Sequence, residues 1–398
     1  MSDISRNDKA LTKRLVIFGL GLADTGLGRV LVEIVSRLKV SWEVTVVLQD
    51  ADGSFPHIDD ISVINMVDDR CKLFKNDVFN NSAVVNAECI LIVGQPWKCI
   101  DLIITVKRTV PTAKIALYLP IEGKPYGEVI VSSAALVDIC IVYTKAMHDQ
   151  LSGCGLELAV IGHGCDQRCR DAGKVSDRQL LRQHLFPNHP SLWKNPLVLN
   201  SNRMYFRKRF DLCLAGFSKA SKRINANLYL HIPNLNRYEE KKLRSKIIEL
   251  NIDDRVFLNL LNKSSSPIPF EQLILLMQSS EVGITTAMGE GWGLGSFEHA
   301  ATGAAQIVPD HIGFKENWGN GEAITIPCDE EYYVHHEAVN MFPPSVSGIS
   351  TALVKMFEEP GLLELMSRRA FDNANSINQE WDDIGCQFDF ILSSLLIT

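Results

Sequence analysis

Short apolar runs alternate with amphipathic segments along most of the chain. The runs are almost continuously apolar, which is typical of strands that are buried on both faces of a parallel sheet. The predicted strands are 14–19, 43–48, 89–94, 114–119 and 139–143 in the first half, and 196–203, 228–232, 256–261, 282–287 and 306–310 in the second half. Because these strands alternate with helical patterns, the sequence predicts an α/β fold.

The segments between the strands carry the helical periodicity. Helices are predicted at 30–35, 210–215, 270–277, 345–358, 361–375 and 382–396. A domain boundary is expected at 166–195. This segment is rich in Arg, Asp, Gln, His and Pro, and it shows no clear periodicity before 178–185. The predicted organisation is a disordered tail (1–13), a first α/β domain (14–165), a linker (166–195), a second α/β domain (196–377) and a terminal helix (378–398). A chain of 398 residues is long enough for two or three domains.

Composition narrows the classes of function. A net charge of −7 argues against a protein that coats nucleic acid, and 46% hydrophobic residues allow a large core. The 10 cysteines are scattered through predicted core segments and the start is polar, without a signal peptide, so we expect reduced thiols in a cytoplasmic protein. Cys165 and Cys169 are not accompanied by a second pair at zinc spacing. No apolar run reaches the ~18 residues that a membrane span needs.

A glycine loop lies between the first predicted strand and a helix. Gly19 and Gly21 fit the first two glycines of a dinucleotide-binding fingerprint, but Asp24 stands at the third position, where helix–strand packing needs Gly or Ala. The sequence therefore gives little support to a nicotinamide dinucleotide site. The later Gly26 and Gly28 fit either a tight turn without a ligand or a close approach to one.

A second glycine-rich stretch, 289–303, joins the predicted strand at 282–287 to a helix expected to begin near Leu294. Glycines at such a turn let the backbone approach a ligand and direct the first N–H groups of the helix at an anion. Glu290 lies in the loop and Glu298 lies about one turn inside the helix, so both can face one ligand. A carboxylate beside a phosphate would be repelled, so Glu298 is expected to bind sugar hydroxyls. The alternative is a turn in some other α/β domain.

Four cations follow the strand at 196–203 within a few residues. They are Arg203, Arg207, Lys208 and Arg209. In a chain that is acidic overall, this cluster indicates a local anion site, although a solvated basic turn is the alternative. A cation ~4 Å from a phosphate charge gains about 4 kcal/mol at an effective dielectric constant of ~20. Such cations would lower the barrier for cleaving a sugar–diphosphate bond, because negative charge develops on the leaving oxygens.

Both stretches resemble signatures of retaining GT-B glycosyltransferases, family 4 in particular. Glu290 and Glu298 match the E-x7-E motif, with Trp292 in place of the usual Phe. Residues 202–213 match "G-R-x-x-x-x-K-G-x-D-L-L", in which the Arg and the Lys hold the donor diphosphate, and Asn and Arg209 here replace its two glycines. This variant looks like glycosyltransferases encoded by large algal viruses. The resemblance implies a GT-B fold, with two Rossmann-like domains whose parallel sheets face a central cleft.

The resemblance implies a catalytic set and a donor-binding set of residues. The implied catalytic residues are Glu290, Lys208 and Arg203. The implied donor-binding residues are Glu298, Gly291, Trp292, Gly293, Leu294, Gly28, Leu260 and Leu261. In relatives, the backbone after the strand at 256–261 contacts the nucleotide base, and the N-terminal glycine loop lies across the cleft from the donor phosphates.

Two loops of the first domain are candidates for the acceptor side. In relatives, the loop at 120–125 often carries a His or an acid near the transferred sugar, so Glu122 and Lys124 are candidates. Residues 160–166 read V-I-G-H-G-C-D and resemble the family's V-I-P-H-G-V-D. His163 is a possible catalytic residue, but a role in fixing the linker by hydrogen bonds is the favoured interpretation.

The sequence thus predicts a retaining glycosyltransferase that moves a hexose from a UDP- or GDP-sugar to a hydroxyl acceptor. The acceptor would be a glycan or a lipid-linked or protein-linked group, and neither a dedicated metal nor a further cofactor is expected. Alternatives are a catalytically silent sugar-nucleotide-binding protein and a GT-B epimerase or phosphorylase. Nucleic acid is not expected as a partner, and no transmembrane segment is expected. The predicted location is the cytoplasm.

Overall fold

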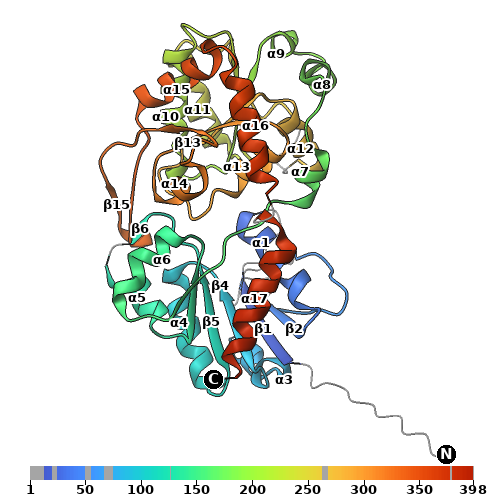
Figure 1. Cartoon of the computed structure of the whole chain (residues 1–398), viewed down its shortest axis with the longest axis vertical. Helices are drawn as coiled ribbons and strands as arrows, with labels where there is room; N and C mark the ends of the chain where they lie inside the picture. The colour runs from blue at the N-terminus through green and yellow to red at the C-terminus, as the bar shows by residue number, and fades with distance from the viewer. Residues whose placement is uncertain are drawn as a thin grey trace, which may run out of the picture.

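The structure is a computed structural model with a lower and an upper α/β domain (Figure 1). It describes residues 13–19, 25–49, 55–66, 75–125, 127–261, 268–376 and 379–397. The predicted tail, except for residue 13, lies outside the described residues. So do Gly21 and Asp24 of the N-terminal glycine loop, and the dinucleotide fingerprint is therefore not described in full.

The first domain is built on a parallel sheet with the strand order β3-β2-β1-β4-β5-β7-β8. Its strands are β1 (Lys13–Gly19), β2 (Trp42–Leu48), β3 (Ser62–Asn65), β4 (Cys89–Val93), β5 (Lys114–Leu119), β7 (Ile139–Val142) and β8 (Leu158–Val160). Leu15 and Ile17 of β1 enter one core cluster, whereas Val16 and Phe18 enter another. Both faces of the sheet are therefore buried, which confirms the strands predicted in this half.

Helices cover both faces of this sheet. They are α1 (Gly26–Leu38), α2 (Lys75–Asn80), α3 (Ser82–Val85), α4 (Pro96–Thr109), α5 (Glu128–Ala134) and α6 (Lys145–Leu151), with the 3-10 turn η1 (Ser152–Cys154). Ile34 of α1 packs in the cluster of Leu15, whereas Ile103 of α4 packs in the cluster of Val16. Helices α1 and α4 therefore lie on opposite faces.

The second domain repeats this plan on a parallel sheet with the order β11-β10-β9-β12-β13-β14. Its strands are β9 (Leu197–Ser201), β10 (Asn227–His231), β11 (Val256–Leu258), β12 (Val282–Ile284), β13 (Ala305–Pro309) and β14 (Ile324–Ile326). Its helices are η2 (Phe206–Lys208), α10 (Phe210–Ala220), α11 (Arg237–Glu249), α12 (Phe270–Gln278), α13 (Leu294–Ala301), α14 (Ile312–Trp318), α15 (Val346–Glu358) and α16 (Leu362–Ala374). The strands and helices that the sequence predicts in this half are confirmed.

The predicted linker, 166–195, is helical over much of its length. It contains α7 (Gln167–Ala172), α8 (Arg178–Leu185) and α9 (Pro190–Lys194). Phe186 and Leu192 pack in one cluster with Leu199 and Tyr229 of the second sheet. Burial of these two side chains fixes the end of the segment against the second domain.

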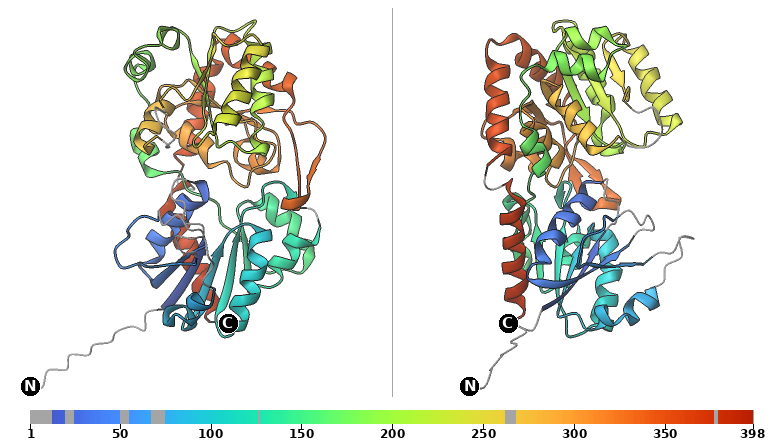
Figure 2. Two further views of the ribbon diagram at one scale, coloured as in Figure 1. Left: turned by 180° about the vertical axis from the view of Figure 1, so that it is seen from behind. Right: turned by 90° about the vertical axis from the view of Figure 1, so that its right-hand side faces the viewer.

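The terminal helix α17 (Trp381–Leu395) returns to the first domain and lies along α1 (Figure 2). Its Phe388 is fully buried, and its Asp389 accepts a hydrogen bond of 2.7 Å from the indole Nε1 of Trp42. Arg37 of α1 pairs with Asp382 at 3.1 Å. The prediction that the last helix crosses back to the first domain is confirmed.

A second connection between the two domains, separate from α17, contains short strands that the sequence pattern did not predict. Residues 328–344, named the arm here, reach from the second domain to the first and contain β15 (Tyr332–Val334), η3 (His335–Glu337) and β16 (Val339–Met341) (Figure 1). Strand β16 pairs antiparallel with β6 (Lys124–Pro125), with Asn340 opposite Lys124. Strands of two or three residues are too short to show a periodicity, which is why the pattern gave no signal for them.

Arg209 occupies the position of the second glycine in the glycosyltransferase pattern that residues 202–213 resemble. Its backbone conformation is one that favours glycine. Its φ of +48° lies in the left-handed region, which L side chains adopt at a cost of about 1 kcal/mol. We therefore expect Arg209→Gly to change the urea midpoint of unfolding very little, because the relief of strain offsets the added freedom of the unfolded chain and the lost pairing with Asp211. Arg209→Val should cost roughly 1–3 kcal/mol. Equal midpoints for the two variants would contradict the assigned backbone conformation.

Candidate active site

The glycine-rich stretch forms a turn that packs against the first domain. Strand β12 leads into it, and α13 begins at Leu294, as predicted. Gly293 caps the helix with φ +84°, and a Cβ on it would lie 2.3 Å from the ring of Phe314. A Cβ on Gly289 would lie 2.0 Å from the carbonyl oxygen of Glu122, a residue of the first domain. Gly289 needs glycine because backbone meets backbone across the two domains, whereas Gly293 needs it because of its positive φ and the ring packed against it.

A cluster of opposite charges lies where the domains meet. Lys208 Nζ pairs with the Oε1 atom of Glu290, the first acid of the motif. Arg207 Nη1 lies 2.9 Å from the same oxygen and donates a hydrogen bond of 2.8 Å to the carbonyl of Gly289. The second guanidinium nitrogen of Arg207 pairs with Glu122 of the first domain. Arg207 therefore links the two domains through two carboxylates.

Burial and charge act against each other at these groups. Burial alone would raise the pKa of Glu290, but Arg207 and Lys208 outweigh it and lower that pKa to about 2. Burial lowers the pKa of Lys208 to about 8, and Arg207 adds to this effect while Glu290 opposes it. At neutral pH the site therefore holds an ionised Glu290 beside a mostly protonated Lys208.

The arm adds a third carboxylate to the cluster. Glu337, which is buried, accepts a hydrogen bond of 3.1 Å from Tyr205 and lies beside Glu122. Burial, together with the charges of Glu290 and Glu337, raises the pKa of Glu122 to about 7 against the opposing charge of Arg207. Three acids compete for two cations, so Glu122 is the group that takes up a proton near neutral pH.

Replacing Glu122 by glutamine is expected to flatten the pH dependence of stability. The folded-state pKa of about 7 exceeds the ordinary value of 4.5, so between these values the folded chain holds a proton that the unfolded chain releases. The stability of the unmodified chain should therefore fall, by roughly 2 kcal/mol, as pH rises from 5 to 7, and this fall should be smaller in Glu122→Gln. Urea midpoints at pH 5, 6, 7 and 8 measure it. Glu128→Gln, at an exposed glutamate, is the control; parallel pH profiles for all three chains would contradict the assignment.

Glu298, expected to bind the ribose, is paired with a cation of the first domain. Arg29, on α1, makes hydrogen bonds of 2.5 Å and 3.1 Å to the two carboxylate oxygens. Glu298 is only 1% exposed, and the guanidinium of Arg29 also lies 4.9 Å from the ring centre of Phe270. The prediction that Glu298 sits one turn inside the helix is confirmed. Its partner was missed, although Arg29 directly follows Gly28 of the glycine loop.

The other predicted site residues do not take part in these ion pairs. Arg203 is exposed after β9, and Arg207 rather than Arg203 joins Lys208 in the charge cluster. The N–H of Gly28 is bound to the hydroxyl of Thr25, which caps α1. The catalytic role of Arg203 and the donor-binding roles of Gly28, of the motif-turn residues and of Leu260 and Leu261 remain predictions. Leu260 and Leu261 pack against the β9–β10 side of the second sheet, and the N–H of Leu261 is bound to the hydroxyl of Tyr229 at 3.1 Å.

His163 does not fix the linker by hydrogen bonds, and that prediction is wrong. Neither ring nitrogen has a hydrogen-bond partner among the residues that the structure describes. The ring instead packs among aromatic side chains, with centroid distances of 4.3 Å to Tyr143, 5.6 Å to Trp292 and 5.8 Å to Tyr118. Burial lowers its pKa to about 3, so the ring is neutral. Trp292, from the motif turn, thus contacts the end of the first domain through His163.

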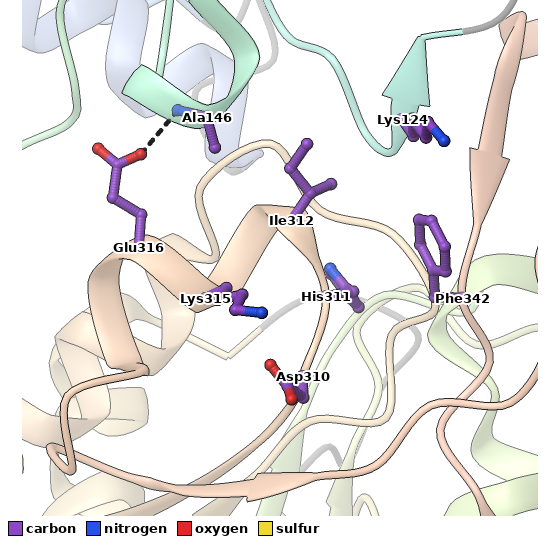
Figure 3. Close-up of a pocket in the computed structure, with 8 residues that line it drawn as sticks. All are labelled: Lys124, Ala146, Asp310, His311, Ile312, Lys315, Glu316 and Phe342. Carbon is purple, nitrogen blue, oxygen red and sulfur yellow. Dashed lines mark hydrogen bonds between the residues drawn. The ribbon is translucent and has the colours of Figure 1, made fainter. Parts of the chain in front are cut away.

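A cavity of about 370 Å³ lies beside the charge cluster, between α6 of the first domain and α14 of the second (Figure 3). It is lined by Lys124, Ala146, Asp310, His311, Ile312, Lys315, Glu316 and Phe342. Glu316 closes one side, because its carboxylate accepts hydrogen bonds from the first N–H groups of α6 at 3.1 Å and 2.8 Å (Figure 3). Lys208, Glu290 and Glu298 are not among the residues that line this cavity.

Within the described ranges, no group of three or more His, Cys, Asp or Glu side chains is arranged to hold a metal ion. The same residues include no helix that is both long enough and apolar enough to cross a membrane. Cys165 and Cys169 are both buried, and burial raises the pKa of each thiol.

No protein-family model matches the chain, and no curated protein sequence matches it. Solved structures do match. Sucrose-phosphate synthase from Thermosynechococcus elongatus has a TM-score of 0.75 at 14% identity, over 97% of this chain and 99% of that one. HepE from Anabaena, in complex with UDP and glucose, has a TM-score of 0.71 at 14% identity, over 96% of this chain and all of that one. The chain has the GT-B fold.

A third GT-B structure, a trehalose-phosphate synthase (UDP-forming) from Burkholderia vietnamiensis, has a TM-score of 0.68 at 13% identity and covers 96% of this chain. The predicted fold class is confirmed, whereas membership of family 4 and likeness to viral enzymes remain predictions. In the GT-B fold, the contacts of Arg207 with Glu122 and of Arg29 with Glu298 both cross from one Rossmann-like domain to the other. The predicted site residues that form ion pairs therefore lie where the two domains meet.

Proposed function

We propose that the chain is a glycosyltransferase that moves a hexose from a nucleotide-diphosphate sugar to a hydroxyl acceptor, with retention at the anomeric carbon. One observation carries the proposal: Lys208 and Glu290 meet at the junction of two Rossmann-like domains, beside a helix whose N-cap is Gly293. A nucleotide sugar needs this combination, because its diphosphate requires cations and helix N–H groups while its sugar hydroxyls require carboxylates.

Lys208 is proposed to neutralise the diphosphate, together with Arg203 and the first N–H groups of α13. In the reaction, the bond between the anomeric carbon and the diphosphate oxygen breaks, and the acceptor oxygen bonds to that carbon on the same face. The acceptor proton passes to the leaving phosphate oxygen, which balances the charge of the products. Glu290, released from Lys208 by the incoming phosphate, steadies the positive charge that develops at the anomeric carbon.

Glu298 is proposed to bind the ribose hydroxyls of the donor. In the structure both of its oxygens are occupied by Arg29, so donor binding would exchange a guanidinium for two hydroxyl groups. The freed Arg29 would face the donor from the first domain, close to the glycine loop. The UDP-bound state of HepE makes a UDP-sugar the first donor to test.

The test is release of nucleotide from UDP-, GDP- and ADP-glucose, with and without glycan acceptors. We expect release with one donor, and loss of most of it in Glu290→Gln. Product anomeric configuration, read by NMR, tests retention separately. Donor binding without turnover would instead indicate a silent sugar-nucleotide-binding protein, and full activity in Glu290→Gln would remove the proposed site.

A further inference from the structure

Aromatic side chains gather on the outside of the 3-10 turn η2 and on the arm that faces it. Tyr205 is 43% exposed and Phe206 is 41% exposed, and their ring centroids lie 4.8 Å apart. The arm contributes Tyr332, which is 56% exposed, and His336, whose ring centroid lies 5.6 Å from that of Phe206. Tyr332 lies near Arg209, which directly follows η2. These four side chains, Tyr205, Phe206, Tyr332 and His336, are named the aromatic surface.

The aromatic surface is continuous with the charge cluster. The hydroxyl of Tyr205 donates a hydrogen bond of 3.1 Å to Glu337, and the guanidinium of Arg207 lies 5.8 Å from the centre of the Tyr205 ring. Glu337 in turn lies beside Glu122 of the first domain. The exposed rings therefore lie over the buried acids and cations at the junction of the domains.

The chemistry of this surface fits a sugar ring. Large side chains left in water at one place indicate a binding site. A pyranose presents a face of C–H groups, which suits the electron-rich face of an aromatic ring, and a rim of hydroxyls, which suits Tyr332, His336 and the charged groups around them. The ion pairs Arg209–Asp211 and Lys124–Glu331 lie next to the aromatic surface. Apolar rings and charged groups are therefore neighbours there. A partner protein would favour a more continuous apolar patch.

We propose that the aromatic surface binds a pyranose ring of the acceptor glycan. This inference rests on the proposed function and deepens it, because it places part of the acceptor on the second domain and on the arm. Phe206 supplies the central ring, since it contacts both Tyr205 of the turn and His336 of the arm. The hydroxyl that receives the hexose belongs to a neighbouring unit of the same glycan, nearer to Glu122. The surface therefore selects acceptors of two or more sugar units.

Saturation-transfer NMR with maltose, cellobiose and methyl α-mannopyranoside tests this inference on the full chain. We expect transfer to the ring C–H protons of at least one disaccharide, and weaker transfer to the monosaccharide. Phe206→Leu should raise the dissociation constant of the disaccharide roughly tenfold. Phe206→Trp should retain binding, because tryptophan keeps a ring face and leucine does not. The control is Tyr238→Ala on α11, where the side chain is 78% exposed and belongs to neither the turn nor the arm.

Thermal unfolding midpoints of all variants check that the fold is intact. The inference is overturned if no saccharide receives saturation, or if Phe206→Leu binds as tightly as the unmodified chain. Nucleotide release by the unmodified chain, measured without acceptor, is a separate readout. Saccharide binding without any release would leave a glycan site on a protein that is not a transferase, whereas release without saccharide binding would overturn the aromatic surface alone.

Discussion

Replacing Lys208 by methionine is expected to lower the rate of nucleotide release by about a thousandfold. The ammonium group lies at the junction of the domains, beside Glu290, where a diphosphate would gain roughly 4 kcal/mol from it at an effective dielectric constant of ~20. Since each 1.36 kcal/mol is tenfold in rate, that loss corresponds to about three orders of magnitude. Methionine keeps the length of the side chain, so packing changes little. Initial rates of UDP release from UDP-glucose measure the effect.

Lys222→Met is the matched control for this prediction, because Lys222 is exposed on a turn of the same domain. It should release nucleotide at the rate of the unmodified chain. If Lys208→Met stays within threefold of that rate, Lys208 does not contact the leaving group. The pKa of about 8 adds a pH signature, since release should decline as pH rises through that value and the ammonium loses its charge.

Replacing Arg29 by methionine is expected to destabilise the chain by about 3 kcal/mol. It would leave Glu298 buried without its cation, and breaking a buried ion pair on one side costs roughly 3–5 kcal/mol. The lower end applies because the side chain of Arg29 is 23% exposed. Burial already raises the pKa of Glu298 against the opposing charge of Arg29, so the uncompensated acid would take up a proton more readily still. The measurement is the urea midpoint at pH 7.

A double variant separates the ion pair from simple loss of packing. Arg29→Met combined with Glu298→Gln removes both charges and should recover a large part of the lost stability. Arg108→Met, at an exposed arginine of α4, is the control and should leave the midpoint unchanged. A change below about 0.5 kcal/mol in Arg29→Met would mean that this ion pair does not hold the domains together.

The sequence could predict the fold because its signals are local and repeated. Buried strands such as β4 are apolar at every position. Helix α13 follows Gly293, whose positive φ favours a residue without a side chain. The acids of the motif fall on different parts of this unit, Glu290 in the turn and Glu298 inside the helix, and the sequence shows both placements. The two parallel sheets and seven of the helices were therefore correctly predicted, whereas helices such as α4 and α11 were not located.

The ion-pair partners across the domain junction could not be predicted from the sequence. The pairing of Arg29 with Glu298 joins residues 269 positions apart, and no periodicity reports such a distance. Arg207 stood among four neighbouring cations, and only the fold distinguishes it from Arg203, which is exposed. His163 was assigned hydrogen bonds because its residue type allows them, whereas packing placed it among rings.

The arm has a consequence for anyone who produces the domains separately. Strand β16 is held by β6, so the first domain alone would present the hydrogen-bonding groups of β6 to water, and the second alone would present those of β16. Because β6 consists of only a lysine and a proline, which limit pairing with other chains, the main loss is that of the pairing itself. Truncation near residue 166 would therefore remove the β6–β16 pairing from both halves, and only a chain that holds both domains keeps it.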